Sequence, residues 1–285
     1  MPTTQGSGLG DPNAPFSFES RDKIDAWSRG AAARAERLGP ATELMLDLAM
    51  IRPGESVLDV AAGTGEQTIL AARRVGPSGS VLATDIAAGM LAVAATAARD
   101  AGLTNVTTRV MDAQRIDLAP SMFDAAISRL GIMALPDPRA AMLGIHRVLK
   151  PGQRCAVMVF STPERNPYTG IPTGILRRHG AKPPARGEAG PFSLGDPGQL
   201  EEVFQHAGFR EIDVHTVPTL QYLPSIDEAI RDLRAKSPIL RDLTAQLGER
   251  ERGVAWDQIK DELRRFEGAH GFEVHGEVLV GAGTK

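Results

Sequence analysis

Between residues 53 and 161, short apolar runs alternate with longer stretches in which apolar residues recur at helical spacing. Short runs of β-favouring residues are typical of buried strands, and the longer stretches are typical of helices that pack on a sheet. The alternation therefore predicts a doubly wound α/β fold with a mostly parallel sheet. The predicted strands are 56–60, 80–84, 106–111, 123–128 and 154–160, and the predicted helices are 68–75, 87–101 and 138–149.

The flanking segments depart from this alternation. Residues 1–15 are rich in Gly, Pro, Ser and Thr and are expected to form a disordered tail, and residues 16–52 a helical N-terminal arm. Residues 162–195 are rich in Pro and Gly, carry a short helical piece at 175–179, and are expected to form a lid. Residues 196–285 are predicted to complete the sheet, with a helix from Asp196-Pro197 to Gly208, strands at 209–217 and 272–280, and a helical insertion at 225–268.

The composition is that of an ordinary globular chain of 285 residues with a formal net charge of −3. Without a basic excess, the sequence predicts neither nucleic acid nor an anionic membrane surface as a partner. No apolar run reaches the roughly 20 residues that span a bilayer, and the first residues lack the apolar segment of a secretory signal. The single cysteine, Cys155, is interpreted as a small buried hydrophobe, so the expected location is the reducing cytoplasm.

The most informative stretch is 57–68, which reads Val-Leu-Asp-Val-Ala-Ala-Gly-Thr-Gly-Glu-Gln-Thr. A strand, a glycine-rich turn and a helix start in this order are typical of nucleotide-binding loops, because Gly63 and Gly65 let the backbone turn sharply beside a ligand. Asp59 lies inside the loop, where its charge repels a phosphate and attracts a cation. This field fits S-adenosylmethionine, which carries a sulfonium, better than it fits NAD.

Two further acidic residues end the next two predicted strands. Asp85 stands 20 residues after Gly65, where a carboxylate accepts hydrogen bonds from the ribose hydroxyls of a bound nucleoside. Asp112 follows the third strand and is expected to accept from the adenine amino group, with Ala113 and Ile86 flanking the ring. Because the carboxyl ends of parallel strands share one edge of a sheet, these carboxylates are expected to converge there with Asp59.

Several segments in this order carry a family resemblance: 57–68, 81–91, 111–113, 123–131, 146–152, 163–167, 190–197 and 207–210. Together they resemble class I S-adenosylmethionine-dependent methyltransferases of the ubiquinone/menaquinone-biosynthesis type, over most of the chain. The resemblance implies a Rossmann-like methyltransferase fold of seven strands, in which the last strand, 272–280, is antiparallel. One departure is Ala61, which stands where the family loop has its first glycine and slightly restricts the loop.

The resemblance also implies roles for single residues. It places residues 59–65 on the methionine end of the cofactor and Ser128 beside the sulfonium. Arg129 either binds an acidic acceptor or pairs with a carboxylate of the arm. The cofactor-binding set is Asp59, Ala61, Gly63, Thr64, Gly65, Asp85, Ile86, Met90, Asp112, Ala113 and Ser128. The acceptor set is Trp27, Arg129, Tyr168 and Phe192, with Phe16 as a further aromatic, and core packing is the alternative role of each aromatic.

The leading interpretation is in-line methyl transfer to a small-molecule acceptor at carbon, oxygen or nitrogen, in secondary or quinone-like metabolism. The protein then contributes alignment and exclusion of water, and a general base is needed only for a hydroxyl or an unactivated carbon acid. His179 in the predicted lid is the weak candidate for this base, whereas His146 is interpreted as structural. The histidines show no metal-ligand spacing, so no metal is predicted.

Two alternatives stay open at this point. One is an S-adenosylmethionine-binding protein of the same fold that is repurposed for a non-methylating reaction, because a fold does not determine a reaction. The other is an NAD(P)-linked oxidoreductase, which the charge of Asp59 disfavours. The sequence leaves open the acceptor and the oligomeric state, for which a homodimer is one option.

Overall fold

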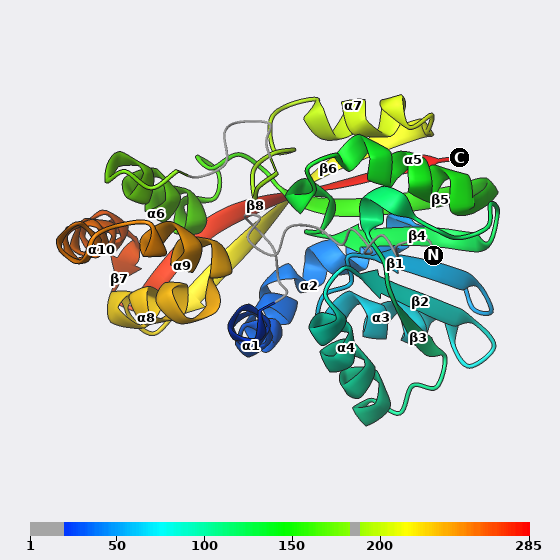
Figure 1. Cartoon of the computed structure of the whole chain (residues 1–285), viewed down its shortest axis with the longest axis horizontal. Helices are drawn as coiled ribbons and strands as arrows, with labels where there is room; N and C mark the ends of the chain where they lie inside the picture. Colours follow the sequence, from blue (N-terminus) through cyan, green and yellow to red (C-terminus); the bar gives the residue numbers. More distant parts are fainter. Residues whose placement is uncertain (1–19, 183–188) are drawn as a thin grey trace, which may run out of the picture.

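The computed structural model describes residues 20–182 and 189–285, so the predicted tail and Phe16 lie outside the described residues. Its centre is a sheet with the strand order β3-β2-β1-β4-β5-β8-β6 (Figure 1). The strands are β1 (Ser56–Val60), β2 (Ser80–Asp85), β3 (Val106–Val110), β4 (Phe123–Arg129), β5 (Leu149–Phe160), β6 (Arg210–Leu223) and β8 (Gly271–Thr284). A short β7 (Glu267–Gly268) pairs with β8 off this path.

The strand directions confirm the doubly wound, mostly parallel fold. β1 to β5 pair in parallel, and β8 enters antiparallel between β5 and β6, as the resemblance implies. The predicted bounds of β1 are correct, and those of β2, β3 and β4 differ from the structure by one residue. β5 begins five residues earlier than predicted, because the chain enters the strand at Leu149 directly after the helix.

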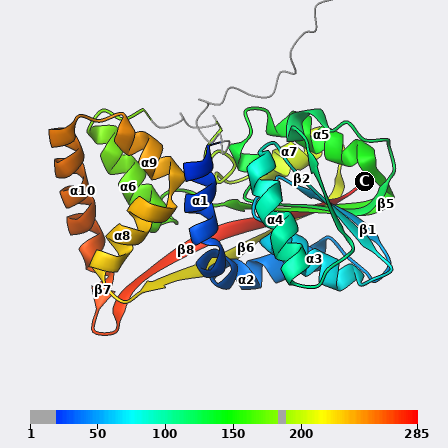
Figure 2. The same ribbon diagram turned by 60° about the horizontal axis from the view of Figure 1, so that its bottom comes forward.

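Helices cover both faces of the sheet (Figure 2). α3 (Glu66–Val75) packs against α2 (Ala31–Leu48) and α4 (Ala88–Asp100) on one face, and α5 (Pro138–Val148) packs against α7 (Gln199–His206) on the other. The main apolar core lies between these layers and the sheet, and it includes Cys155, which is fully buried as interpreted. Helix α3 begins at Glu66, two residues before the predicted start, since Gly65 takes a left-handed φ of 87° and turns the chain straight into the helix.

Two Asp-Pro pairs in the sequence behave differently. Asp137 caps α5, because its Oδ1 accepts a hydrogen bond from the amide of Ala140 at 3.0 Å and Pro138 takes the first helical turn. The predicted cap at Asp196 is wrong. Gly198 has a left-handed φ of 82° and interrupts the turn, so α7 begins only at Gln199, without a side-chain cap.

A second lobe stands on the far ends of β6 and β8 (Figure 1, left). Both strands are 14 residues long and therefore exceed the predicted spans, and they pair as far as Leu223 and Phe272. The lobe contains α6 (Pro167–Arg178), α8 (Ile226–Lys236), α9 (Pro238–Ala245) and α10 (Glu249–Leu263), which share an apolar core with Phe272. Segments of the predicted lid and of the predicted insertion thus bury their apolar faces against each other.

The N-terminal arm consists of α1 (Arg21–Arg29) and α2, joined at Gly30. α1 packs against α4 of the core and against α8 and α9 of the lobe, so it lies between the two (Figure 2). Lys23 forms an ion pair with Asp242 of α9 at 2.8 Å. A Cβ on Gly89 would lie 2.3 Å from Cδ1 of Ile24, so α1 closes directly over the start of α4. None of the described helices is long and apolar enough to cross a membrane.

Candidate cofactor site and acceptor pocket

The loop between β1 and α3 depends on three left-handed residues. Ala61, Gly63 and Gly65 have φ values of 54°, 58° and 87°. The alanine bears a conformational cost of roughly 1–2 kcal/mol at this angle, in line with the restricted loop expected from its substitution. At Gly65 a Cβ would also lie 2.8 Å from Cβ of Ala94 in α4, so the loop and the helix approach each other closely.

Asp59 is fully buried beneath this loop. One carboxylate oxygen accepts from Thr68 Oγ1 at 2.5 Å and the other from Gln67 Nε2 at 3.1 Å. Burial raises the pKa of Asp59 to about 7, although both hydrogen bonds act against the shift. Asp59 therefore ties the loop to α3, and at neutral pH it is a weaker source of negative charge than an exposed carboxylate.

Asp85 joins the second strand tip to the same loop. Its Oδ2 accepts from the amide of Gly63 at 2.9 Å, and its Oδ1 accepts from the amide of Ala87 at 2.9 Å. Burial raises the pKa of this carboxyl group. Each oxygen retains acceptor capacity beyond these single bonds, so the carboxylate is held in place and is still able to accept from a ligand hydroxyl.

Asp112 lies at the third strand tip, because β3 ends at Val110 and Val110 is in register with Asp85. The side chain caps a short 3-10 turn (Ala113–Arg115), and its Oδ1 accepts from the amide of Gln114 at 2.9 Å. No hydrogen bond from the described residues reaches its Oδ2. Ala113 and Met90 are buried beside this edge.

A buried charge cluster completes the edge. Glu66, the first residue of α3, accepts from Arg34 at 2.5 Å, from Arg129 at 2.7 Å and from Thr64 Oγ1 at 2.8 Å. Two guanidinium groups thus share one carboxylate, which leaves one positive charge in excess. Burial lowers the pKa of Arg34 to about 10 and also lowers the pKa of Arg129. One of the two roles predicted for Arg129 was an ion pair with a carboxylate of the arm. Arg129 does form an ion pair, but the carboxylate belongs to α3. The contact of Arg129 with the arm is a hydrogen bond to Thr42 Oγ1 at 3.5 Å.

Sequence reasoning missed Glu66 and Arg34. The available signal was an acidic residue directly after the glycine loop and one of two arginines in an Ala-rich helix, and neither specifies a partner. Arg34 also brings Trp27 to the loop, since its guanidinium lies 3.9 Å from the centre of the indole ring. A Cβ on Gly63 would lie 3.5 Å from Trp27 Nε1, so the tryptophan covers the loop.

Ser128 lies where β4 reaches the same edge. It is fully buried, and its hydroxyl has no hydrogen-bond partner among the described residues. A Cβ on Gly131 would lie 2.8 Å from this hydroxyl and 2.5 Å from Cβ of Ala61, so the turn after β4 packs tightly on the cofactor loop.

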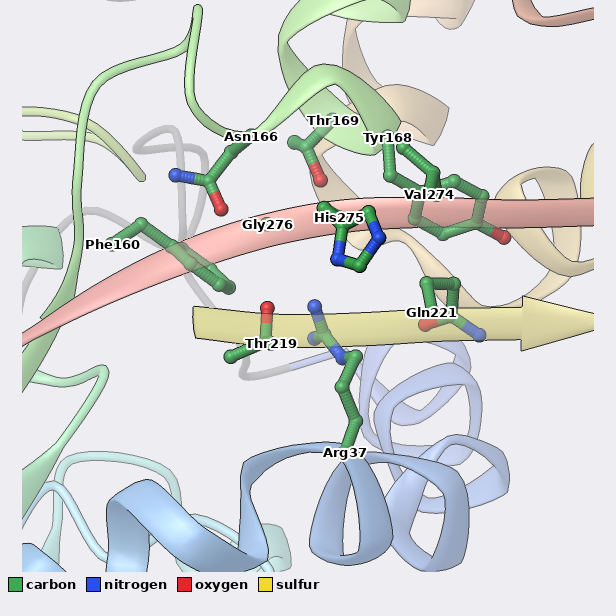
Figure 3. Close-up of a pocket in the computed structure, with 10 residues that line it drawn as sticks. All are labelled: Arg37, Phe160, Asn166, Tyr168, Thr169, Thr219, Gln221, Val274, His275 and Gly276. Atoms are coloured by element: carbon green, nitrogen blue, oxygen red, sulfur yellow. The ribbon is translucent and has the colours of Figure 1, made fainter. Parts of the chain in front are cut away.

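A pocket lies between α2, α6 and the β6–β8 pair, and Figure 3 shows its lining. Its lining includes Arg37, Phe160, Asn166, Tyr168, Thr219, Val274 and His275. Phe192 extends the aromatic wall, with its ring centre 6.4 Å from that of Phe160.

Of the residues predicted for this region, Tyr168 is engaged in a hydrogen bond and His179 lies far from the pocket. Tyr168 donates its hydroxyl hydrogen to Asp232 at 2.9 Å, and burial raises the pKa of Tyr168 strongly. His179 ends α6 against Gln258 of α10, with its Nε2 3.0 Å from the amide oxygen. At 1.5 Å per residue, the length of α6 separates His179 from Asn166 at the sheet by about 18 Å. His146 packs edge-on against Phe209 with ring centres 5.0 Å apart, as expected for a structural residue.

The described residues contain no group of acidic, histidine and cysteine side chains that would hold a metal ion.

Comparison with known proteins assigns this chain to a family. A methyltransferase domain profile matches residues 51–178. The ubiquinone/menaquinone biosynthesis C-methyltransferase UbiE from Shewanella frigidimarina is 31% identical over 179 residues, which are 59% of this chain and 71% of the relative. UbiE from Teredinibacter turnerae is 38% identical over 122 residues, which are 42% of this chain and 49% of the relative, so the match spans about half of that protein.

The chain belongs to the class I S-adenosylmethionine-dependent methyltransferases. Solved structures share the fold of this methyltransferase. The YcgJ protein from Bacillus subtilis superimposes with a TM-score of 0.59 at 20% identity, over 87% of this chain and 98% of that chain. The [4+2]-cyclase SpnF superimposes with a TM-score of 0.55 at 21% identity, over 86% of this chain and 80% of that chain. The family assignment does not support the NAD(P)-linked alternative.

The residues at the edge fit the cofactor of this family. The left-handed loop leaves its backbone open to close approach, and Asp85 is held ready to accept hydrogen bonds. The buried hydroxyl of Ser128 and the free Oδ2 of Asp112 offer polar contacts that the described protein residues do not use. Polar groups thus lie along the carboxyl ends of the first four strands, where they are able to contact the cofactor.

Proposed function

We propose that this chain transfers a methyl group from S-adenosylmethionine to a small-molecule acceptor. The observation that carries the proposal is the hydrogen bond from Gly63 to Asp85, because it fixes the strand tip that would hold the ribose to the loop that would hold the methionine end. Asp112 and Ala113 would hold the adenine. The excess positive charge of Arg34 and Arg129 would attract the carboxylate of the methionine part.

When bound, the cofactor supplies an electrophilic methyl group on a positively charged sulfur. The task of the chain is to orient the acceptor and to exclude water, and α1 serves the second purpose by closing over the loop with Trp27. Where the acceptor atom needs a base, we propose His275, which lines the pocket, in place of His179. The bond of Tyr168 to Asp232 makes the tyrosine a wall of the pocket, not a base.

A second candidate function rests on SpnF, a protein of this fold that is named as a [4+2]-cyclase. The same polar groups would then hold S-adenosylmethionine without transferring its methyl group. The family assignment favours methyl transfer, because the sequence relatives are methyltransferases.

The test has two stages. Calorimetry with S-adenosylhomocysteine measures binding at the edge, and we expect tight binding by wild type. Methyl-labelled cofactor is then incubated with a panel of carbon, oxygen and nitrogen acceptors. Label on any acceptor supports methyl transfer. Binding of S-adenosylhomocysteine without label on any acceptor favours the second candidate, and absence of binding contradicts both.

We further propose that the protein works in the reducing cytoplasm as a homodimer. The buried thiol of Cys155 suits a reducing compartment. For the dimer, the supporting feature is β6, the edge strand of the described sheet, which exposes Val214, Leu220 and Tyr222 on one face. Light scattering on wild type tests the dimer, and a monomer at micromolar concentration contradicts it.

A further inference from the structure

Arg37 stands apart from the other arginines near the cofactor edge. It lies on α2, one turn after Arg34, and its guanidinium extends across β6 between Thr219 and Gln221 (Figure 3). No residue that the structure describes gives it a hydrogen bond or an ion pair, and its closest ring contact is Phe160, with the guanidinium carbon 5.8 Å from the ring centre. Burial lowers the pKa of this guanidinium. The Arg37 side chain is partly buried, and its guanidinium can hold an anion that enters the pocket.

Thr219 provides an independent observation in the same pocket. It is 5% exposed, and its hydroxyl has no hydrogen-bond partner in the described part of the chain. The hydroxyl faces Gly276, where a Cβ would lie 2.8 Å from Thr219 Oγ1 and 3.0 Å from Asn166 Oδ1. A guanidinium carries donors alone and a hydroxyl can donate, so the two groups together suit a ligand that accepts hydrogen bonds and bears negative charge.

The acidic groups around the pocket are already engaged. Asp232 accepts from Tyr168 at 2.9 Å and pairs with Lys236 at 2.5 Å. Glu277 accepts from Ser161 at 2.7 Å. Besides burial, Tyr168 and Asp232 raise the pKa of Arg37 and Arg129 lowers it, and within the described part of the chain no hydrogen bond or ion pair joins Arg37 to any of the three. The positive charge of Arg37 therefore remains for a ligand.

The other residues that line the pocket indicate the polarity of the rest of that ligand. Asn166 is unavailable, because its amide clamps the backbone of Glu277 with bonds of 2.9 and 3.0 Å. Phe160 and Val274 present apolar surface. Since Arg34 contacts Thr64 of the cofactor loop at 3.2 Å, α2 carries one arginine to the cofactor and the next to this pocket. The pocket thus lies where an acceptor would approach the methyl donor.

We propose that Arg37 and Thr219 bind an oxyanion of the methyl acceptor, a carboxylate or a phosphate, while Phe160 and Val274 hold its apolar body. This inference rests on the proposed function, because it names the class of molecule that the methyltransferase accepts. The apolar walls and the anion site together define an amphipathic acid as the acceptor.

The first test uses the full chain with S-adenosylhomocysteine bound and two probe anions, inorganic phosphate and benzoate, at constant ionic strength. Calorimetry measures anion binding to wild type, Arg37→Gln, Arg37→Lys and Thr219→Val. We expect Arg37→Gln to weaken binding about tenfold or more and Thr219→Val by a smaller factor. Arg37→Lys recovers part of the loss, since it keeps the charge without the planar fork. Arg177→Gln, an exposed arginine of α6, is the control and keeps wild-type affinity.

The outcomes separate this inference from the proposed function. Binding of phosphate or benzoate that depends on Arg37 supports the site, and the tighter of the two anions identifies the source as phosphate or carboxylate. Absence of anion binding to wild type, or equal binding by wild type and Arg37→Gln, overturns the site while S-adenosylhomocysteine still binds. Failure of S-adenosylhomocysteine to bind wild type overturns the proposed function instead.

A kinetic test follows once an acceptor is found. Each acid is compared with its uncharged amide, and wild type is expected to prefer the acid about tenfold or more in kcat/KM. Arg37→Gln removes this preference mainly through KM. The same preference in Arg37→Gln and wild type contradicts the proposal, because a merely structural arginine would not distinguish the acid from its amide.

Discussion

The two sites along α2 differ in whether their arginines have partners within the protein. At the cofactor edge, Arg34 and Arg129 share Glu66, and the carboxylate of Asp59 is held by α3. One turn further along α2, Arg37 has no partner among the described residues. A guanidinium that is held by a carboxylate has its position before the ligand arrives, whereas a guanidinium with open donors depends on the ligand to complete its hydrogen bonds. The proposed cofactor site is therefore largely preformed, and the proposed acceptor site is completed by its ligand.

The largest expected effect comes from removing the shared carboxylate. Glu66→Ala leaves two buried guanidinium groups without compensation and is expected to destabilise the fold by about 3–5 kcal/mol. Glu43→Ala, which breaks the exposed pair with Arg74, is the control and is expected to cost below about 1 kcal/mol. Urea denaturation measures both. Equal losses in the two variants would mean that the cluster does not stabilise the edge.

The next effect is a pH dependence. The folded pKa of Asp59 is raised to about 7 from an unfolded value of about 3.9, so the folded state binds the extra proton between these values. Stability from this group is therefore fully present below pH 4 and is lost as pH rises through 7. Between pH 5 and 8, the free energy of unfolding of wild type should fall by about 2–3 kcal/mol relative to that of Asp59→Asn, whose side chain does not titrate. Denaturation curves at several pH values measure this, and parallel profiles would contradict the buried carboxyl.

Cofactor affinity gives a third comparison. Asp85→Ala is expected to weaken S-adenosylhomocysteine binding by about 1–3 kcal/mol, because it removes a charged acceptor and frees the amide of Gly63. Asp124→Ala is the matched control, since Asp124 accepts from the amide of Ser56 at 3.0 Å at the opposite edge of the sheet. Calorimetry should show near wild-type affinity for the control. Unchanged affinity in Asp85→Ala would place the ribose elsewhere.

The smallest effect concerns the open site. Arg37→Gln removes a partly buried charge that has no partner among the described residues, so we expect the free energy of unfolding to stay within about 1 kcal/mol of wild type. Arg129→Gln, which breaks a buried pair, should instead be destabilising. Thermal unfolding of the two variants compares the sites directly. A fall in Tm for Arg37→Gln of the size seen for Arg129→Gln would remove the contrast between them and assign Arg37 a structural role.

Local patterns were sufficient for the core. The alternation of apolar runs predicted β1 and the order of strands and helices, because the periodicity of a strand or a helix depends on residues that are close together in the sequence. The acidic residues Asp85 and Asp112 were predicted at strand tips for the same reason, since a parallel sheet brings those tips to one edge. Where a left-handed glycine interrupts a turn, as at Gly198, a local cap signal was misleading.

Contacts between distant segments were decided by the tertiary structure alone. Arg34, Glu66 and Arg129 come from three elements, and no spacing along the chain specifies that two arginines share one carboxylate. The lobe likewise forms because α6 and α8 to α10 each have an incomplete apolar face that only the others cover. The lack of a partner for Arg37 among the described residues is the clearest case, because it depends on every element packed around this partly buried charge. Neighbouring residues therefore predict the elements of the methyl donor site, and the packing of α2 against β6 and β8 places Arg37 at the proposed acceptor site.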